Sequence, residues 1–80
     1  MQNYNELGNV IRFHRKKARL SQLELSKIAG VGKTVVFDVE KGKLSVQLSS
    51  LIQILHVLNI KLEFTSPLMN LYKELHVKES

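Results

Sequence analysis

The side chains with the clearest chemistry in this sequence are basic, and they gather in its first half. Residues 1–43 contain nine Lys or Arg residues and four Asp or Glu residues, whereas residues 44–80 contain three of each, so the whole formal charge of +5 lies in the first half. The densest group is Arg12, Arg15, Lys16, Lys17 and Arg19. Such a cationic surface attracts the phosphate groups of nucleic acid regardless of sequence. A solubilising surface is the ordinary alternative for a run of charges.

Two short helices separated by a tight turn are predicted in the same half of the chain. Ser21 can accept hydrogen bonds from the first-turn amides of a helix, and Glu24, three residues later, completes a capping box. Gly30 stands where this helix must stop, and Gly42 ends the next one. We expect the helices at residues 22–29 and 32–41, with Val36 and Val39 buried. This is the pattern of a helix-turn-helix, whose short helices need further helices to pack against.

The remaining elements follow from hydrophobic periodicity. Apolar residues at helical spacing predict helices at 6–19 and 48–58, and Ser66-Pro67 is typical of a cap followed by a first helical position. Gln47 is a poor cap, so we expect a frayed start to the helix after it. Between the helix at 48–58 and the helix that follows Ser66-Pro67, the residues Ile60, Leu62 and Phe64 alternate with polar residues, which predicts a strand.

The predicted strand indicates a second copy of the chain. A single strand cannot satisfy its own backbone groups, and no other strand pattern is present in the sequence. The simplest partner is the same strand in a homodimer, antiparallel about a two-fold axis. In such a dimer the two copies of the helix at 32–41 would lie about 34 Å apart, which implies an inverted-repeat binding site on DNA. The alternative is a tail that is merely extended.

Composition bounds the remaining possibilities. Eighty residues make one small domain, and the absence of cysteine excludes disulfides and thiolate chemistry and fits a reducing compartment. No apolar run approaches the roughly 18 residues of a membrane span, so we expect a soluble cytoplasmic protein. Gly32-Lys33-Thr34 lacks the earlier glycine and the strand of a phosphate-binding loop, and the three histidines are scattered. We therefore expect no enzyme activity, no cofactor and no metal.

Several short motifs resemble the XRE-type, lambda-repressor-like DNA-binding family. They are Leu7-Gly8-x-x-Ile11-Arg12-x-x-Arg15, Leu20-Ser21-Gln22, Ala29-Gly30-Val31 and Glu40-x-Gly42-Lys43. The helical pattern of residues 48–58, which runs directly into Ile60-Lys61-Leu62-Glu63-Phe64, is similar to HipB-type antitoxins.

The resemblance implies an all-α fold, a lambda-repressor-like helical domain with a C-terminal strand that pairs across a homodimer. The implied organisation is a DNA-binding domain at 1–59, a dimerising strand at 60–66 and a helical tail at 67–80. The implied function is a repressor that binds operator DNA and serves as the antitoxin of a HipA-type kinase toxin. A stand-alone regulator without a toxin is the alternative, and a protein-interaction module with an incidental basic face is the third hypothesis.

The resemblance also implies which residues meet DNA and which meet the second copy. Gln22 is expected to hold a phosphate, Lys33 to donate to guanine, Thr34 to touch a thymine methyl or a phosphate, and Lys43 to bind phosphate. Asp38 could accept from cytosine N4 or could simply be solvated, and Phe37 either packs on a thymine methyl or covers the edge of the preceding helix. The full expected DNA-binding set is Gln22, Gly32, Lys33, Thr34, Phe37, Asp38 and Lys43, and the dimerising set is Ile60, Leu62 and Phe64.

Arg15 and Glu40 are kept out of the DNA-binding set. In repressors of this type the matching residues form an ion pair that ties the first helix to the end of the third. The resemblance therefore implies a structural role for both residues in this chain.

Overall fold

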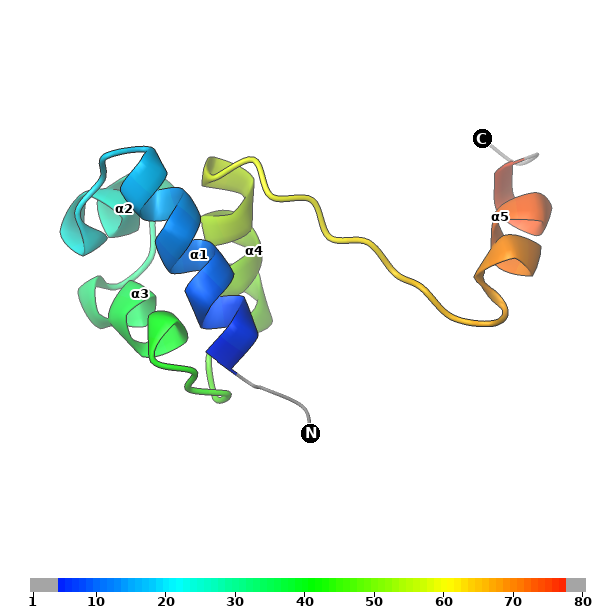
Figure 1. Ribbon diagram of the computed structural model, residues 1–80, viewed down its shortest axis with the longest axis horizontal. Helices are drawn as coiled ribbons and strands as arrows, with labels where there is room; N and C mark the ends of the chain where they lie inside the picture. The colour runs from blue at the N-terminus through cyan, green and yellow to red at the C-terminus, as the bar shows by residue number, and fades with distance from the viewer. Residues whose placement is uncertain (1–4, 78–80) are drawn as a thin grey trace.

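The computed structural model describes residues 5–77, and five helices follow one another within this range. They are α1 (Asn5–Lys17), α2 (Gln22–Ala29), α3 (Lys33–Glu40), α4 (Leu48–Val57) and α5 (Met69–Val77). Figure 1 shows α1 to α4 gathered in one bundle, while α5 stands apart at the end of an extended segment. The outer ends of the expected domains, residues 1–4 and 78–80, lie outside the described residues. The expected all-α architecture is confirmed.

One small apolar core holds the bundle together. Its buried side chains come from all four helices and are Ile11, Leu25, Ala29, Val36, Val39, Ile54 and Leu55. Within the bundle, α2 packs against both α3 and α4, and α1 packs against α3. Each helix is too short to persist alone, so its stability depends on this shared burial. The core therefore fixes the position of α3 relative to α1 and α2.

The predicted capping box of α2 is present. The Ser21 hydroxyl accepts from the Glu24 backbone N–H at 3.0 Å, and the Ser21 N–H donates to Glu24 Oε1 at 2.8 Å. Two hydrogen bonds with Ser21 lower the pKa of the Glu24 carboxyl below its usual value. The bond from the Ser21 backbone has the larger effect, and the bond with its side chain has the smaller one. This contact therefore contributes fully to folding stability at a pH above the usual pKa of a glutamate carboxyl. The contribution is lost as the pH falls through the lowered pKa of Glu24. By contrast, Gly32 and Gln47 precede α3 and α4 without a side-chain cap.

Left-handed residues end the four helices of the bundle. Gly30 and Gly42 have φ values of 71° and 88°, as the sequence predicts, and Arg19 and Asn59 adopt φ values of 61° and 58° after α1 and α4. At Arg19 the next amide, that of Leu20, turns back to donate to the Arg15 carbonyl at 3.1 Å. The expectation that the first helix reaches Arg19 is therefore wrong, because the left-handed turn closes the helix at Lys17.

The predicted strand is not formed in this single chain. No strand occurs in residues 5–77, and residues 61–66, which we call the arm, run from the bundle toward α5 as an extended segment (Figure 1). The physical reason is that a strand needs a ladder partner, and the described part of this chain offers none. The last helix also begins later than Pro67, because the Ser66 carbonyl and hydroxyl accept from the Met69 and Leu68 amides and form a turn first.

Gly8 allows α1 to approach the end of α3. A Cβ atom at Gly8 would lie 2.5 Å from the Val39 carbonyl oxygen and 2.7 Å from the Glu40 carbonyl oxygen. Both neighbours are backbone atoms, so α1 would have to move to admit a methyl group. Gly8→Ala is therefore expected to lower the free energy of unfolding by about 1–3 kcal/mol, measured by urea denaturation.

Gly32→Ser is the matched control for that substitution. A Cβ atom at Gly32 would meet only the Val35 Cγ2 methyl group at 3.5 Å, and the backbone there is extended with φ −62°. A serine at this position can also cap α3, so its stability should equal or exceed that of the parent chain. Equal stability of the Gly8→Ala and parent chains would show that α1 does not depend on this close approach.

Candidate nucleic-acid interface

The turn between α2 and α3 sets the direction in which α3 leaves the core. The Gly30 amide donates to the Lys27 carbonyl at 3.3 Å and the Val31 amide to the Ser26 carbonyl at 3.0 Å, which closes α2. Val31 is half-buried against the core, so it anchors the turn. After Gly32 the chain enters α3 directly. The connection is therefore short and held at both ends, which limits how far α3 can move.

One face of α3 is buried and the other is open. Val36 is fully buried and Val39 is 4% exposed, and both point into the core. Helical spacing turns Thr34, Phe37 and Lys41 to the other side, and all three are exposed, as is Lys33 at the first turn. Among the expected contact residues of this helix, the structure therefore places Lys33, Thr34 and Phe37 on the open surface. This open face carries two cations, a hydroxyl and an aromatic ring.

Phe37 lies at the edge of a polar hollow between α1 and α3. The hollow, about 440 Å³ in volume, is lined by Asn5, Asn9, Arg12, Arg15, Gln22, Phe37, Glu40 and Lys41. The Phe37 ring is 44% exposed, and the Lys41 ammonium lies 5.0 Å from its centroid. The ring is thus part of the open face next to Gln22, the first residue of α2, and does not belong to the core.

A buried ion pair closes the bottom of this hollow. Arg15 Nε donates to Glu40 Oε2 at 2.6 Å and Arg15 Nη2 to Glu40 Oε1 at 3.1 Å, while Arg15 Nη1 donates to the Leu20 carbonyl at 2.8 Å. The two side chains are only 10% and 4% exposed. The ion pair predicted between the first helix and the end of the third is therefore confirmed. It joins α1, α3 and the loop before α2.

Gln22 joins the same network, which the sequence did not predict. Its side-chain amide donates to Glu40 Oε1 at 3.0 Å, so the carboxylate receives bonds from both α1 and α2. A carboxamide carries two N–H groups, and this bond uses one of them. The other N–H of Gln22 can therefore donate to a ligand in the hollow, while the bond to Glu40 fixes the orientation of the side chain.

Asp38 and Lys43 lie together on the other side of α3. Lys43 Nζ is 3.6 Å from Asp38 Oδ2, and the two side chains are 58% and 31% exposed. Both line a second hollow, of about 200 Å³, which also includes Ser45 and Gln47. The nearby cation lowers the cost of holding this carboxylate close to a polyanion. The expected DNA-binding residues therefore form two groups on either side of the first turn of α3, which carries Lys33 and Thr34. Gln22 and Phe37 form one group, and Asp38 and Lys43 form the other.

Two basic residues, Lys41 and Arg12, are additional candidates. Both line the hollow with Gln22 and Phe37. A signal for Lys41 was present in the sequence, because it follows Thr34 by seven residues, or two helical turns. Arg12 was visible only as one member of the basic cluster, and its position beside α3 depends on how α1 crosses the bundle.

Neither a membrane-spanning helix nor a metal-binding cluster occurs within residues 5–77. None of the helices in that range combines the length and the hydrophobicity of a transmembrane segment. No group of three or more His, Asp or Glu side chains in it is arranged to hold a metal ion.

Comparison with known proteins gives concordant results. A family model described as helix-turn-helix matches residues 11–64. The chain is also similar to the uncharacterized HTH-type transcriptional regulator y4mF of Sinorhizobium fredii, with 34% identity over 62 residues, which span 78% of this chain and 82% of that protein. Together with the α2–turn–α3 geometry, these matches show that the chain belongs to the XRE-type helix-turn-helix family of transcriptional regulators.

Proposed function

We propose that this protein is a sequence-specific DNA-binding repressor that acts as a homodimer on an inverted-repeat operator. The observation that carries the proposal is the open face of α3, where Lys33, Thr34, Phe37 and Lys41 lie opposite the buried Val36 and Val39. A helix of this kind fits the major groove of B-DNA, which is about 12 Å wide. The formal charge of +5 comes from the half of the chain that contains α3.

In this proposal, different residues supply affinity and specificity. Gln22, Lys43 and the backbone at Gly32 contact phosphates on the two sides of α3, with Lys41 and Arg12 adding charge. Lys33 and Thr34 read base edges from the first turn of the helix, and Phe37 packs on thymine methyl groups. Asp38 accepts from cytosine N4 while Lys43 balances its charge. The DNA-binding unit is then residues 1–59, followed by a dimerising segment at 60–66 and a tail at 67–80.

Dimerisation supplies the second half-site. Ile60 is half-buried against the core, and the arm that follows it carries exposed Leu62 and Phe64 side chains. An antiparallel pair of these segments would satisfy their backbone groups and place two copies of α3 on one side of the DNA.

Selection from a random duplex library tests this function. The protein should enrich an inverted repeat whose half-sites are about one helical turn apart. The double variant Lys33→Ala/Thr34→Ala should weaken binding to the selected site by about 1–3 kcal/mol per lost base contact. Lys73→Ala, which removes an exposed lysine from α5, is the control. Enrichment of no sequence, or equal loss in both variants, would contradict the proposal.

We further propose that the repressor is the antitoxin of a HipA-type kinase toxin. The support is the resemblance of the last bundle helix and the arm to HipB-type proteins. A kinase-like open reading frame beside this gene, and a complex of the two purified proteins on size exclusion, are the expected results. If no such gene is adjacent and no kinase copurifies, the chain is the alternative, a stand-alone XRE-type regulator.

A further inference from the structure

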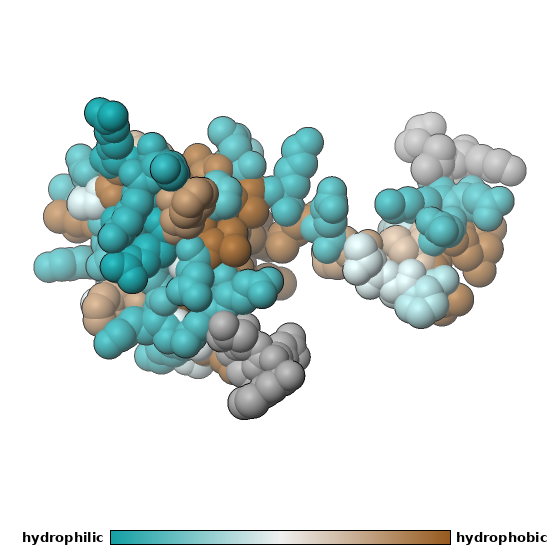
Figure 2. Space-filling view, viewed as in Figure 1, coloured by the Kyte–Doolittle hydropathy of each residue, from teal (hydrophilic) through white to brown (hydrophobic). Residues whose placement is uncertain are grey.

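The arm and α5 carry apolar side chains that the protomer leaves uncovered. Six of them are between 52% and 72% exposed: Leu62, Phe64, Leu68, Leu71, Tyr72 and Leu75. Figure 2 shows apolar residues along the arm and a further group around α5, well away from the bundle. Because α5 and the arm have no core of their own, their apolar side chains need a surface on another part of the protein.

The bundle offers a matching surface along α4. Residues 44–60 form a run of 17 positions without Asp, Glu, Lys or Arg, although the chain as a whole is 24% charged. Within it Leu44, Leu48 and Ile52 are 72%, 66% and 45% exposed. Absence of charge on an exposed apolar face is typical of the centre of a protein interface. We call these three side chains, with Leu51 beneath them, the α4 face.

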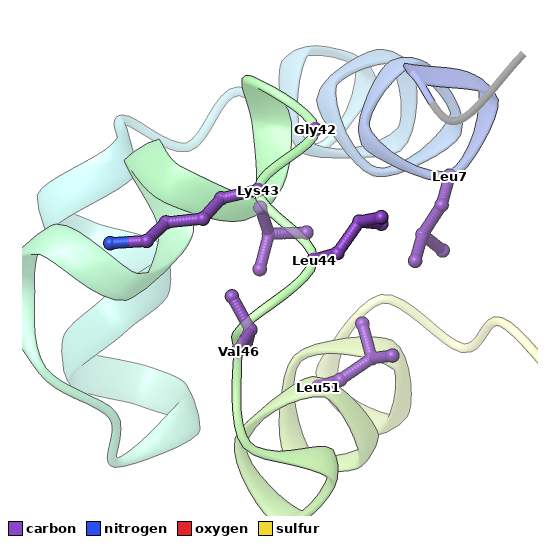
Figure 3. Close-up of a pocket in the computed structure, with 7 residues that line it drawn as sticks. Leu7, Gly42, Lys43, Leu44, Val46 and Leu51 are labelled. Atoms are coloured by element: carbon purple, nitrogen blue, oxygen red, sulfur yellow. The ribbon is translucent and has the colours of Figure 1, made fainter.

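An apolar hollow continues this face at its beginning. It has a volume of about 80 Å³, and Figure 3 shows Leu7, Leu44 and Leu51 pointing toward it from α1, the loop before α4 and α4. Lys43 points away, toward the side where it meets Asp38 (Figure 3). The apolar surface therefore ends where the candidate DNA-binding surface begins.

We propose that the occupant of the α4 face is the tail of a second copy of this chain. The two arms pair antiparallel about Leu62, and each α5 crosses to cover the α4 face of the other copy. This arrangement rests on the homodimer proposed above and adds to it a register and a second contact surface.

The charges on the arm select the register. With the two-fold axis at Leu62, Ile60 faces Phe64 of the second copy, and Lys61 faces its Glu63, so both pairs are complementary. Moving the axis by one residue places Lys61 opposite Lys61, or Glu63 opposite Glu63. Like charges directly opposite each other destabilise a sheet, so only the register at Leu62 joins apolar to apolar and acid to base.

The direction of the strands then determines where α5 goes. In antiparallel strands the end of one lies beside the start of the other, which places Ser66 beside Leu58 of the second copy, at the end of its α4. From there α5, nine residues long, extends about 13 Å, and α4, ten residues long, about 15 Å. Leu68, Leu71 and Leu75 can thus run back along the α4 face of the second copy toward its apolar hollow.

Single cysteines test the register, because the natural chain contains none. Leu62→Cys should form a disulfide-linked dimer on mild oxidation, since directly opposed strand residues have Cα atoms about 4.5–5.5 Å apart. Phe64→Cys alone should not, because its two copies would lie about 13 Å apart, although Phe64 is the more exposed side chain. A mixture of Ile60→Cys and Phe64→Cys chains should form a linked heterodimer. Linkage of Phe64→Cys in preference to Leu62→Cys would overturn the register.

Charge reversal tests the same pairing without oxidation. Lys61→Glu and Glu63→Lys should each weaken the dimer by about tenfold, because each creates two like-charge pairs. The double variant Lys61→Glu/Glu63→Lys should restore the parent dissociation constant in sedimentation equilibrium. Additive weakening in the double variant would show that these residues do not face each other.

The crossing of α5 needs a separate test. In the double variant Ile52→Cys/Leu71→Cys, a short bismaleimide should join two chains if α5 covers the α4 face of the second copy. A cross-link within one monomer, or none, would overturn the crossing. A parent chain that sediments as a monomer would overturn the homodimer itself, whereas a dimer that selects an inverted repeat but fails the cysteine tests refutes only this arrangement.

Discussion

Replacement of Glu40 by alanine is expected to lower the free energy of unfolding by about 3–5 kcal/mol, because it leaves the Arg15 guanidinium buried without its partner. The carboxylate receives two hydrogen bonds from Arg15 and one from Gln22, and its side chain is only 4% exposed. A chain of 80 residues has a total stability of about 4–12 kcal/mol. The loss should appear as a large fall in the urea midpoint and in Tm.

The controls separate the buried pair from a general effect of removing negative charge. Glu6→Ala removes an exposed carboxylate from α1 and should change stability by no more than about 0.5 kcal/mol. Glu40→Gln keeps the size and one acceptor of the side chain, so its loss should be smaller than that of the alanine variant. At temperatures where the Glu40→Ala chain is still folded, its DNA affinity should fall by no more than the loss of the phosphate contact of Gln22, whose side chain Glu40 orients. An unchanged Tm would contradict the structural role of this pair.

DNA affinity is expected to fall steeply with salt. A dimer that neutralises about 6–10 phosphates should lose roughly three to five orders of magnitude in affinity between about 50 and 200 mM salt. The physical cause is the release of counterions from the duplex by the Lys and Arg side chains around α3. A mobility-shift titration at several salt concentrations gives the slope of log affinity against log salt.

Single lysine variants assign that slope to particular residues. Removing one phosphate contact should reduce the magnitude of the slope by about one, so a substitution present in both copies of the dimer should reduce it by about two. We expect this result for Lys41→Ala and Lys43→Ala, which line two different hollows beside α3. Lys73→Ala, on α5, should leave the slope unchanged. A slope near zero in the parent protein would mean that the basic half of the chain does not bind phosphate.

Local signals in the sequence correctly predicted several features of the bundle formed by α1 to α4. Ser21 and Glu24 form the capping box, Gly30 and Gly42 adopt positive φ, and Val36 and Val39 are buried, each as its spacing predicts. These features depend on neighbours only a few positions away, so they can be read without knowing the fold. The Arg15–Glu40 pair, 25 residues apart, came from the family resemblance and is also present.

Features that depend on distant contacts were not predicted. The bond from Gln22 to Glu40 and the approach of Gly8 to the end of α3 both require the crossing of two elements. The pairing of Asp38 with Lys43 is local, five residues apart, and was missed because it depends on the turn that follows α3. The strand prediction identified an alternating pattern correctly, but a pattern of side chains cannot supply backbone partners. In the proposed homodimer the second copy supplies those partners.

Amide chemical-shift mapping on the ¹⁵N-labelled protein shows which helix contacts DNA. On addition of a selected operator duplex, the largest changes should follow the open face of α3, at Lys33, Thr34, Phe37 and Lys41, and extend to Gln22. Residues of α4, from Leu48 to Val57, should change little, because that face is turned to another protein surface in the proposed dimer. Changes centred on α4 or α5, with α3 unaffected, would contradict the assignment of α3 as the helix that enters DNA.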